Sequence, residues 1–79
     1  MTNFAARLRW ARKRRGMTQP ELSRTAGLAR DHVRSLEAKR YDNPTEKTRT
    51  KLAEALGFAG SSRIWFVYGI GEKPEARAS

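Results

Sequence analysis

Cysteine is absent from the 79 residues, so the chain can neither form a disulfide nor bind a metal through thiolates. Its single histidine, His32, provides no cluster of imidazole ligands, and we expect this side chain to face solvent or a phosphate. No apolar run approaches the length of a membrane-spanning helix, and residues 1–4 lack the apolar core of a signal peptide. We therefore expect a cytoplasmic protein without a metal, a cofactor or a membrane contact.

Groups that perform catalysis are also scarce. The sequence contains no glycine-rich phosphate loop, no carboxylates paired on one helix face and no nucleophilic thiol. A chain of 79 residues has room for one domain with a modest core and for no second, ligand-binding unit. We therefore expect neither an enzyme nor a receptor for a small molecule.

Acidic residues are few compared with basic ones. Seventeen Lys and Arg stand against eight Asp and Glu, which gives a net charge of +9. Residues 1–40 hold eleven basic and three acidic side chains, a net of +8, whereas residues 41–79 hold six and five, a net of +1. This asymmetry is typical of a surface that faces a polyanion. A solvated basic helix and an RNA-binding surface are alternatives, but no aromatic residue interrupts the basic stretch to stack on RNA bases.

Apolar residues in the first half recur with helical spacing between start and end signals. Asn3 is expected to cap a first helix, which Gly16 ends. Thr18 and Glu21 have the spacing of a capping box at the start of a second helix. A third helix is expected at about residues 30–38.

The second half predicts two further helices, which makes the fold all-α. Asn43 is expected to cap the fourth helix, with Pro44 as its first residue. Ser61 or Ser62 is expected to cap a short, strongly apolar fifth helix that Gly69 ends.

The stretch from Gln19 to Ala38 has the pattern of a helix-turn-helix unit. Ser23 is small where two crossing helices approach closely, and Gly27 can leave the first helix in a left-handed conformation. The angle between the helices is filled by apolar residues, namely Leu22, Leu28, Val33 and Leu36. A generic helical hairpin is the alternative, but such a hairpin does not require this register.

These segments resemble the Cro and phage-repressor-like (Xre-type) family of helix-turn-helix regulators. The likeness is carried by residues 12–22, 27–28 and 33–37, and it continues with Pro44, residues 52–57 and the ending Trp65 to Gly69. It spans about residues 4–69.

The resemblance implies a compact five-helix bundle of the lambda-repressor-like type, with the helix-turn-helix at helices two and three. It places this DNA-binding domain at residues 1–70 and leaves a polar tail, expected to be disordered, at residues 71–79. It further implies a sequence-specific regulator of transcription that binds double-stranded DNA, a repressor or Cro-like protein of phage or prophage type.

In the resembled family the third helix enters the major groove of DNA. The resemblance implies that Gln19 contacts a backbone phosphate and helps to position this helix. It also implies an ion pair between Arg12 and Glu37, which would orient the third helix rather than add much stability. The alternative is that the two residues are ordinary surface charges.

The helical spacing places Val33 and Leu36 inward on the third helix, so the opposite face is free to contact bases. We expect base contacts from Ala29, Arg30, Asp31, Arg34 and Ser35, with the two arginines best suited to guanine edges. For Asp31, capping of the helix N-terminus is the preferred alternative. Contacts to the DNA backbone are expected from Thr18, Gln19, Arg40, Tyr41 and Asn43.

The fifth helix is apolar on nearly all sides, which is more than the surface of a monomer usually accepts. We therefore expect a homodimer that binds an inverted-repeat operator, with the dimer contact at Trp65, Phe66, Val67 and Tyr68. An antitoxin or another interaction module that also binds its own promoter is the alternative function.

The sequence departs from the family pattern at several positions. Ala29 stands where a capping Ser or Thr is usual, and Lys39 stands where glycine usually follows the third helix. The link at residues 58–62 is about three residues longer than usual. Trp10 replaces an expected polar residue and is interpreted either as packing under the C-terminal tail or as contacting a partner.

Overall fold

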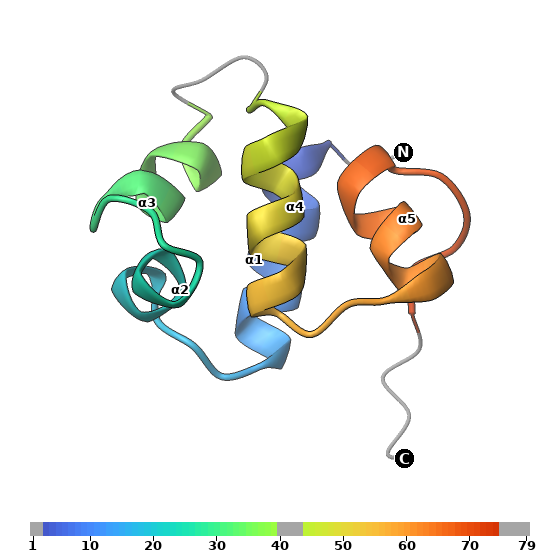
Figure 1. Cartoon of the computed structure of the whole chain (residues 1–79), viewed down its shortest axis with the longest axis horizontal. Coiled ribbons are helices and arrows are strands. Elements are labelled where there is room, and N and C mark those ends of the chain that lie inside the picture. Colours follow the sequence, from blue (N-terminus) through green and yellow to red (C-terminus); the bar gives the residue numbers. More distant parts are fainter. Residues whose placement is uncertain (1–2, 40–43, 75–79) are drawn as a thin grey trace.

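The computed structural model describes residues 3–39 and 44–74. Within these ranges the chain forms five helices, α1 (Phe4–Arg14), α2 (Gln19–Thr25), α3 (His32–Glu37), α4 (Glu46–Ala55) and α5 (Gly60–Tyr68), and no strand. In Figure 1, α1 and α4 occupy the middle, with α2 and α3 on one side and α5 on the other. The predicted all-α, five-helix architecture is confirmed. Among the described residues, no helix has the length and apolarity needed to cross a membrane.

The first two helices begin where the local sequence predicts. The Oδ1 atom of Asn3 accepts a hydrogen bond of 2.8 Å from the backbone N–H of Ala6. The Thr18 hydroxyl accepts from the backbone N–H of Glu21, and the Glu21 carboxylate accepts from the backbone N–H of Thr18. The bond from the backbone N–H of Thr18 is the main reason that the pKa of Glu21 is lowered, because it favours the ionised carboxylate. The predicted capping box is therefore confirmed.

The starts of α4 and α5 differ from the predictions. Thr45, rather than Asn43, caps α4, because its extended backbone lets the hydroxyl accept from the N–H of Thr48 at 3.2 Å. Asn43 itself lies outside the described residues. The helix α5 already begins at Gly60, after an extended Ala59 that makes no side-chain cap, so neither Ser61 nor Ser62 is the cap.

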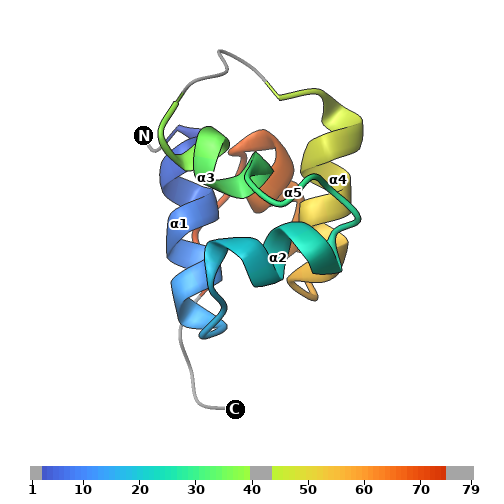
Figure 2. The same ribbon diagram turned by 90° about the vertical axis from the view of Figure 1, so that its left-hand side faces the viewer.

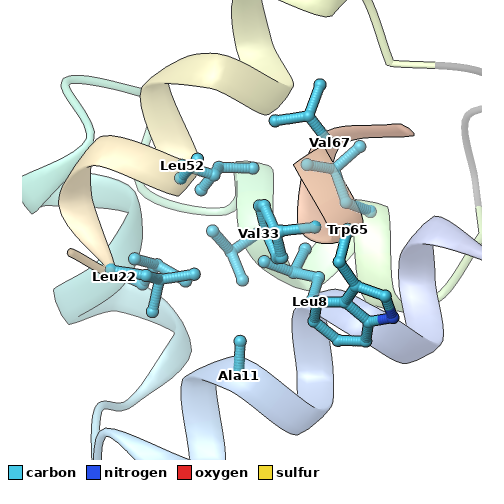
Figure 3. Packing of buried hydrophobic residues seen from close by; sticks show 11 residues of the cluster. Leu8, Ala11, Leu22, Val33, Leu52, Trp65 and Val67 are labelled. Atoms are coloured by element: carbon cyan, nitrogen blue, oxygen red, sulfur yellow. The ribbon is translucent and has the colours of Figure 1, made fainter. Parts of the chain in front are cut away.

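The core lies where all five helices converge. Side chains from every helix point toward one another there, as Figure 3 shows for Leu8 of α1, Leu22 of α2, Val33 of α3 and Leu52 of α4. These four side chains have no exposed surface. Because a core residue contributes about 1.5–3 kcal/mol when fully buried, this shared cluster holds the short helices together.

The apolar face of α5 is covered within the protomer. Trp65, Phe66 and Val67 are at most 5% exposed. The Phe66 ring packs edge-on against Phe4 and stacks on Phe58, with ring centroids 5.1 Å apart in both pairs. The predicted dimer contact is therefore wrong for residues 65–67, because all three side chains are already buried in the core of the protomer.

Trp10 also packs against α5. Its ring lies edge-on to that of Trp65, with centroids 5.3 Å apart. The guanidinium carbon of Arg14 and the Nζ atom of Lys73 lie 5.2 and 5.1 Å from the centroid of the Trp10 ring. Of the two interpretations of Trp10, the structure therefore supports packing against α5 and the segment that follows it.

Polar contacts at the C-terminal end of α5 complete its attachment. The Nε atom of Arg7, a buried side chain on α1, donates to the carbonyl of Phe66 at 3.0 Å. Burial lowers the pKa of Arg7, and the nearby charge of Arg49 lowers it further. The Tyr68 hydroxyl donates to the carboxylate of Glu46, and this bond raises the pKa of Tyr68 because it favours the protonated phenol.

Candidate nucleic-acid interface

The helices α2 and α3 form the predicted helix-turn-helix. Gly27 has φ +74°, the left-handed conformation that ends α2, while the N–H of Leu28 returns to the carbonyl of Ser23 at 2.8 Å. A Cβ atom built on Gly27 would meet nothing within 4 Å, so backbone conformation, not space, is what favours glycine here. The turn brings α3 across α2 with Leu22 and Val33 buried between them.

A hydrogen bond from α3 to Ser23 holds this crossing. The Oγ atom of Ser23, which is fully buried, accepts from the backbone N–H of Val33 at 3.0 Å. That N–H belongs to the first turn of α3, where no intrahelical partner is available. Ser23 therefore caps α3 from the neighbouring helix, a role that the sequence did not reveal.

The start of α3 differs from the prediction. The helix runs from His32 to Glu37 rather than over residues 30–38, and the N–H of His32 bonds the carbonyl of Ala29 in a preceding turn. Asp31 occupies the N-cap position, but its side chain makes no cap hydrogen bond. Its ψ of 10° departs from the extended conformation in which a capping carboxylate reaches back to the helix. The preferred interpretation of Asp31 as the cap is therefore wrong.

The outward face of α3 and of the turn before it is polar and accessible. Figure 2 views this side of the molecule, with α2 and α3 nearest to the viewer. Four of the five predicted base-contacting residues are exposed, namely Ala29, Arg30, Asp31 and Arg34. The fifth, Ser35, is half-buried. The structure thus places the five residues on a single turn-and-helix segment.

Behind α3, Arg12 and Glu37 form a two-pronged ion pair. The Nε and Nη2 atoms of Arg12 donate to the two Glu37 carboxylate oxygens at 2.6 and 3.0 Å. The pair is well shielded, with 12% of the Arg12 side chain and 6% of the Glu37 side chain exposed. Arg12 also donates to the carbonyl of Met17 at 2.9 Å, so the same guanidinium joins α1, the link to α2, and α3.

Gln19 belongs to this network. Its Nε2 atom donates to Oε1 of Glu37 at 3.0 Å, which connects the first residue of α2 with the last residue of α3. The amide nitrogen carries a second N–H, so this bond leaves one donor that can serve a DNA phosphate. Thr18, next to it, is exposed, whereas Arg40, Tyr41 and Asn43 lie outside the described residues.

Two exposed basic residues near this face were not among the predicted contacts. Arg9 is exposed on α1 and lines a hollow together with Gln19 and Arg34. Its position three residues before Arg12 could have indicated this, because residues so spaced lie on one helix face. Lys39 is exposed just after α3 and has φ +60°. It therefore adopts the left-handed conformation at the position where the family pattern has glycine.

The comparison with protein families agrees with this geometry. The family model described as Helix-turn-helix (HTH_3) matches residues 8–59, a range that begins within α1, contains α2, α3 and α4, and ends just before α5. Neither the comparison with curated proteins nor that with solved structures gives a match. The chain belongs to the Cro/C1-type (Xre-type) helix-turn-helix family and has the lambda-repressor-like fold. It is a DNA-binding regulator of transcription that binds double-stranded DNA.

Proposed function

We propose that the protein is a sequence-specific repressor or Cro-like protein of phage type, which binds an inverted-repeat operator in the cytoplasm as a homodimer. The observation that carries the proposal is the outward face of α3 and of the turn before it. Arg34 is exposed on α3 and Arg30 is exposed in that turn, and the Arg12–Glu37 pair holds the helix from its inner side. A guanidinium can donate two hydrogen bonds to a guanine edge in the major groove. A rigidly held helix keeps such contacts in register.

The remaining predicted residues are assigned by their positions. Ala29, Asp31 and Ser35 lie on the same segment as the two arginines and complete the base-contacting set. Thr18 and Gln19 stand at the start of α2 and are proposed to contact the DNA backbone, as are Arg40, Tyr41 and Asn43. Contacts of this second kind set the position of the protein on the duplex without selecting a sequence.

The dimer is proposed because one short helix contacts too little DNA to recognise a specific site. A single reading helix contacts too few base pairs to choose one site in a genome, and two modules double the contacts. Because residues 65–67 are in the core, we assign the contact to the exposed apolar residues of α5 and its end. These are Ile64, Tyr68 and Ile70, which are 46%, 51% and 63% exposed.

Selection of bound sites from random duplex DNA tests the proposal. Selected sites should be inverted repeats with centres about 34 Å, or one helical turn, apart. On such a site, Arg34→Ala should lose about 1–3 kcal/mol of binding free energy, with little change on random DNA. Gln19→Ala is the matched variant, because Gln19 is proposed to contact the DNA backbone. It should weaken binding to both duplexes by similar factors.

Two results would contradict this assignment. Full-affinity binding of one chain to an unrepeated half-site would exclude the dimer. An equal loss on both duplexes for Arg34→Ala would make Arg34 a phosphate contact and leave base recognition to Arg30 and its neighbours.

A further inference from the structure

We propose that Arg9 on α1 binds a phosphate of the DNA backbone, in a hollow between α1 and the end of α3. This inference rests on the proposed mode of DNA binding and adds a third helix to the interface. The hollow is formed by residues of α1, α2 and α3 and by the residue after α3, namely Arg9, Arg12, Gln19, Arg34, Glu37 and Ala38. It thus adjoins the outward face of α3, on which Arg34 is exposed.

The charges around this hollow favour an anion. Among the described residues that line it, the one carboxylate is that of Glu37, which already accepts hydrogen bonds from Arg12 and from Gln19. In this described part of the lining, three arginines against one glutamate give a charge of +2. Arg9 and Arg34 are exposed, and neither forms an ion pair with any residue in the described part of the chain. Their guanidinium groups are therefore available to an external anion, and Arg9 can donate two hydrogen bonds to a phosphate.

The register of α1 explains why Arg9, rather than its other arginines, reaches this place. Arg12 is attached to Glu37, the last residue of α3, and Arg9 lies one turn earlier on the same face of α1. Arg14 points elsewhere, since its guanidinium lies over the ring of Trp10, which packs on Trp65 of α5. The chain therefore offers a matched control with the same change in charge on a different face of the same helix.

The test compares Arg9→Gln and Arg14→Gln with the wild type on a selected operator and on random duplex DNA, at several salt concentrations. Each phosphate contact contributes about 0.9 to the slope of log K against log salt. Arg9→Gln should lower the magnitude of this slope by about 0.9. At 0.1 M salt it should weaken binding to both duplexes about five- to tenfold. Arg14→Gln should change affinity less than about twofold and keep the slope, and Arg9→Lys should also keep it. Thermal unfolding of each variant verifies that it is folded.

A second measurement links Arg9 to a particular phosphate. Neutral methylphosphonate groups replace single phosphates along the operator, one at a time. One replacement should weaken the wild type and have no further effect on Arg9→Gln, because both changes remove the same contact. Equal salt slopes for Arg9→Gln and Arg14→Gln would overturn the assignment of Arg9. So would losses of binding free energy that add at every phosphate. Neither result would affect the conclusion that the protein binds DNA. A wild type that binds no duplex would overturn the proposed function and, with it, the role of Arg9.

Discussion

At the scale of single residues, the position of α3 depends on polar contacts that other parts of the chain make with it. The short α3 has no side-chain cap of its own, and Ser23 of α2 supplies one to the N–H of Val33. The ion pair of Arg12 with Glu37 holds the other end of the helix. Both contacts are shielded from water, so the loss of either would leave a buried polar group without its partner.

Ser23→Ala should destabilise the protein by about 1–3 kcal/mol, because the buried N–H of Val33 loses its acceptor. Thr25→Ala is the matched control, since Thr25 is exposed at the end of the same helix and its loss should cost within about 0.5 kcal/mol. Urea unfolding followed by circular dichroism measures both. Equal midpoints and slopes for the two variants would show that the Ser23 hydroxyl does not hold α3.

Arg12→Ala should cost far more stability than Arg14→Ala. Removal of Arg12 leaves the shielded Glu37 carboxylate unpaired, at a cost of about 3–5 kcal/mol. Arg14 is exposed and loses a contact with the Trp10 ring worth about 0.5–1 kcal/mol. Melting temperatures of the two variants give the comparison, and similar values would mean that the pair is not buried in solution.

At the scale of elements, the end of α3 carries a conformational cost. Lys39 is the only non-glycine residue with positive φ among residues 3–39 and 44–74. A side chain in the left-handed conformation costs about 1–2 kcal/mol, because its Cβ atom approaches a carbonyl oxygen. The helix nevertheless ends there, as the N–H of Lys39 bonds the carbonyl of Leu36 at 3.1 Å.

Lys39→Gly should therefore stabilise the protein by about 1 kcal/mol, which corresponds to a rise in Tm of about 4–8 °C for a domain of this size. Lys39→Ala removes the same charge but retains the Cβ atom, so it should give no such rise. Differential scanning calorimetry of the three proteins separates the backbone effect from the charge. A Tm for Lys39→Gly at or below that of Lys39→Ala would contradict the strained conformation.

At the scale of the whole molecule, most of the large apolar side chains of α5 are part of the core rather than of the surface. Its central aromatic residues are buried against Phe4, Trp10 and Phe58, so the proposed dimer depends on the exposed apolar residues around them. Ile64, Tyr68 and Ile70 offer a small patch, and such a dimer would form more readily on DNA, where the two sites hold the chains together.

Ile64→Lys places a charge in this patch without disturbing the core, because Ile64 is exposed. We expect the variant to unfold like the wild type but to bind an inverted-repeat operator without cooperativity between its two halves. A duplex with one half-site is the internal control, since a single chain should bind it as the wild type does. Undiminished cooperativity on the full operator would place the dimer contact elsewhere.

Much of the fold was predictable because its signals are local. The caps at Asn3 and Thr18 act on N–H groups three residues away, so the nearby sequence determines them whatever the rest of the chain does. The pattern of small, left-handed and apolar residues from Gln19 to Ala38 likewise identified the helix-turn-helix. Prediction failed where two local signals competed, as at the start of α4, where Thr45 and not Asn43 is the cap.

The candidate site was only partly predictable for the same reason. Helical spacing separated the outward residues of α3 from Val33 and Leu36, which are buried. It could not show that the Asp31 side chain makes no cap hydrogen bond to α3, since that depends on a backbone turn at Ala29. It also could not place Arg9 beside Arg34, because a sequence pattern does not tell which neighbour each face of α1 meets.

The sequence by itself determined the helices, the helix-turn-helix register and the excess of positive charge, because these depend on neighbours within a few positions or on composition. Only the tertiary structure decided which apolar side chains of α5 are covered, since Phe4 reaches them from the other end of the chain and Phe58 folds back from the link before α5. It also decided that Ser23 caps a helix ten residues further on. Contacts of this kind form between faces brought together by packing, and no local pattern specifies them.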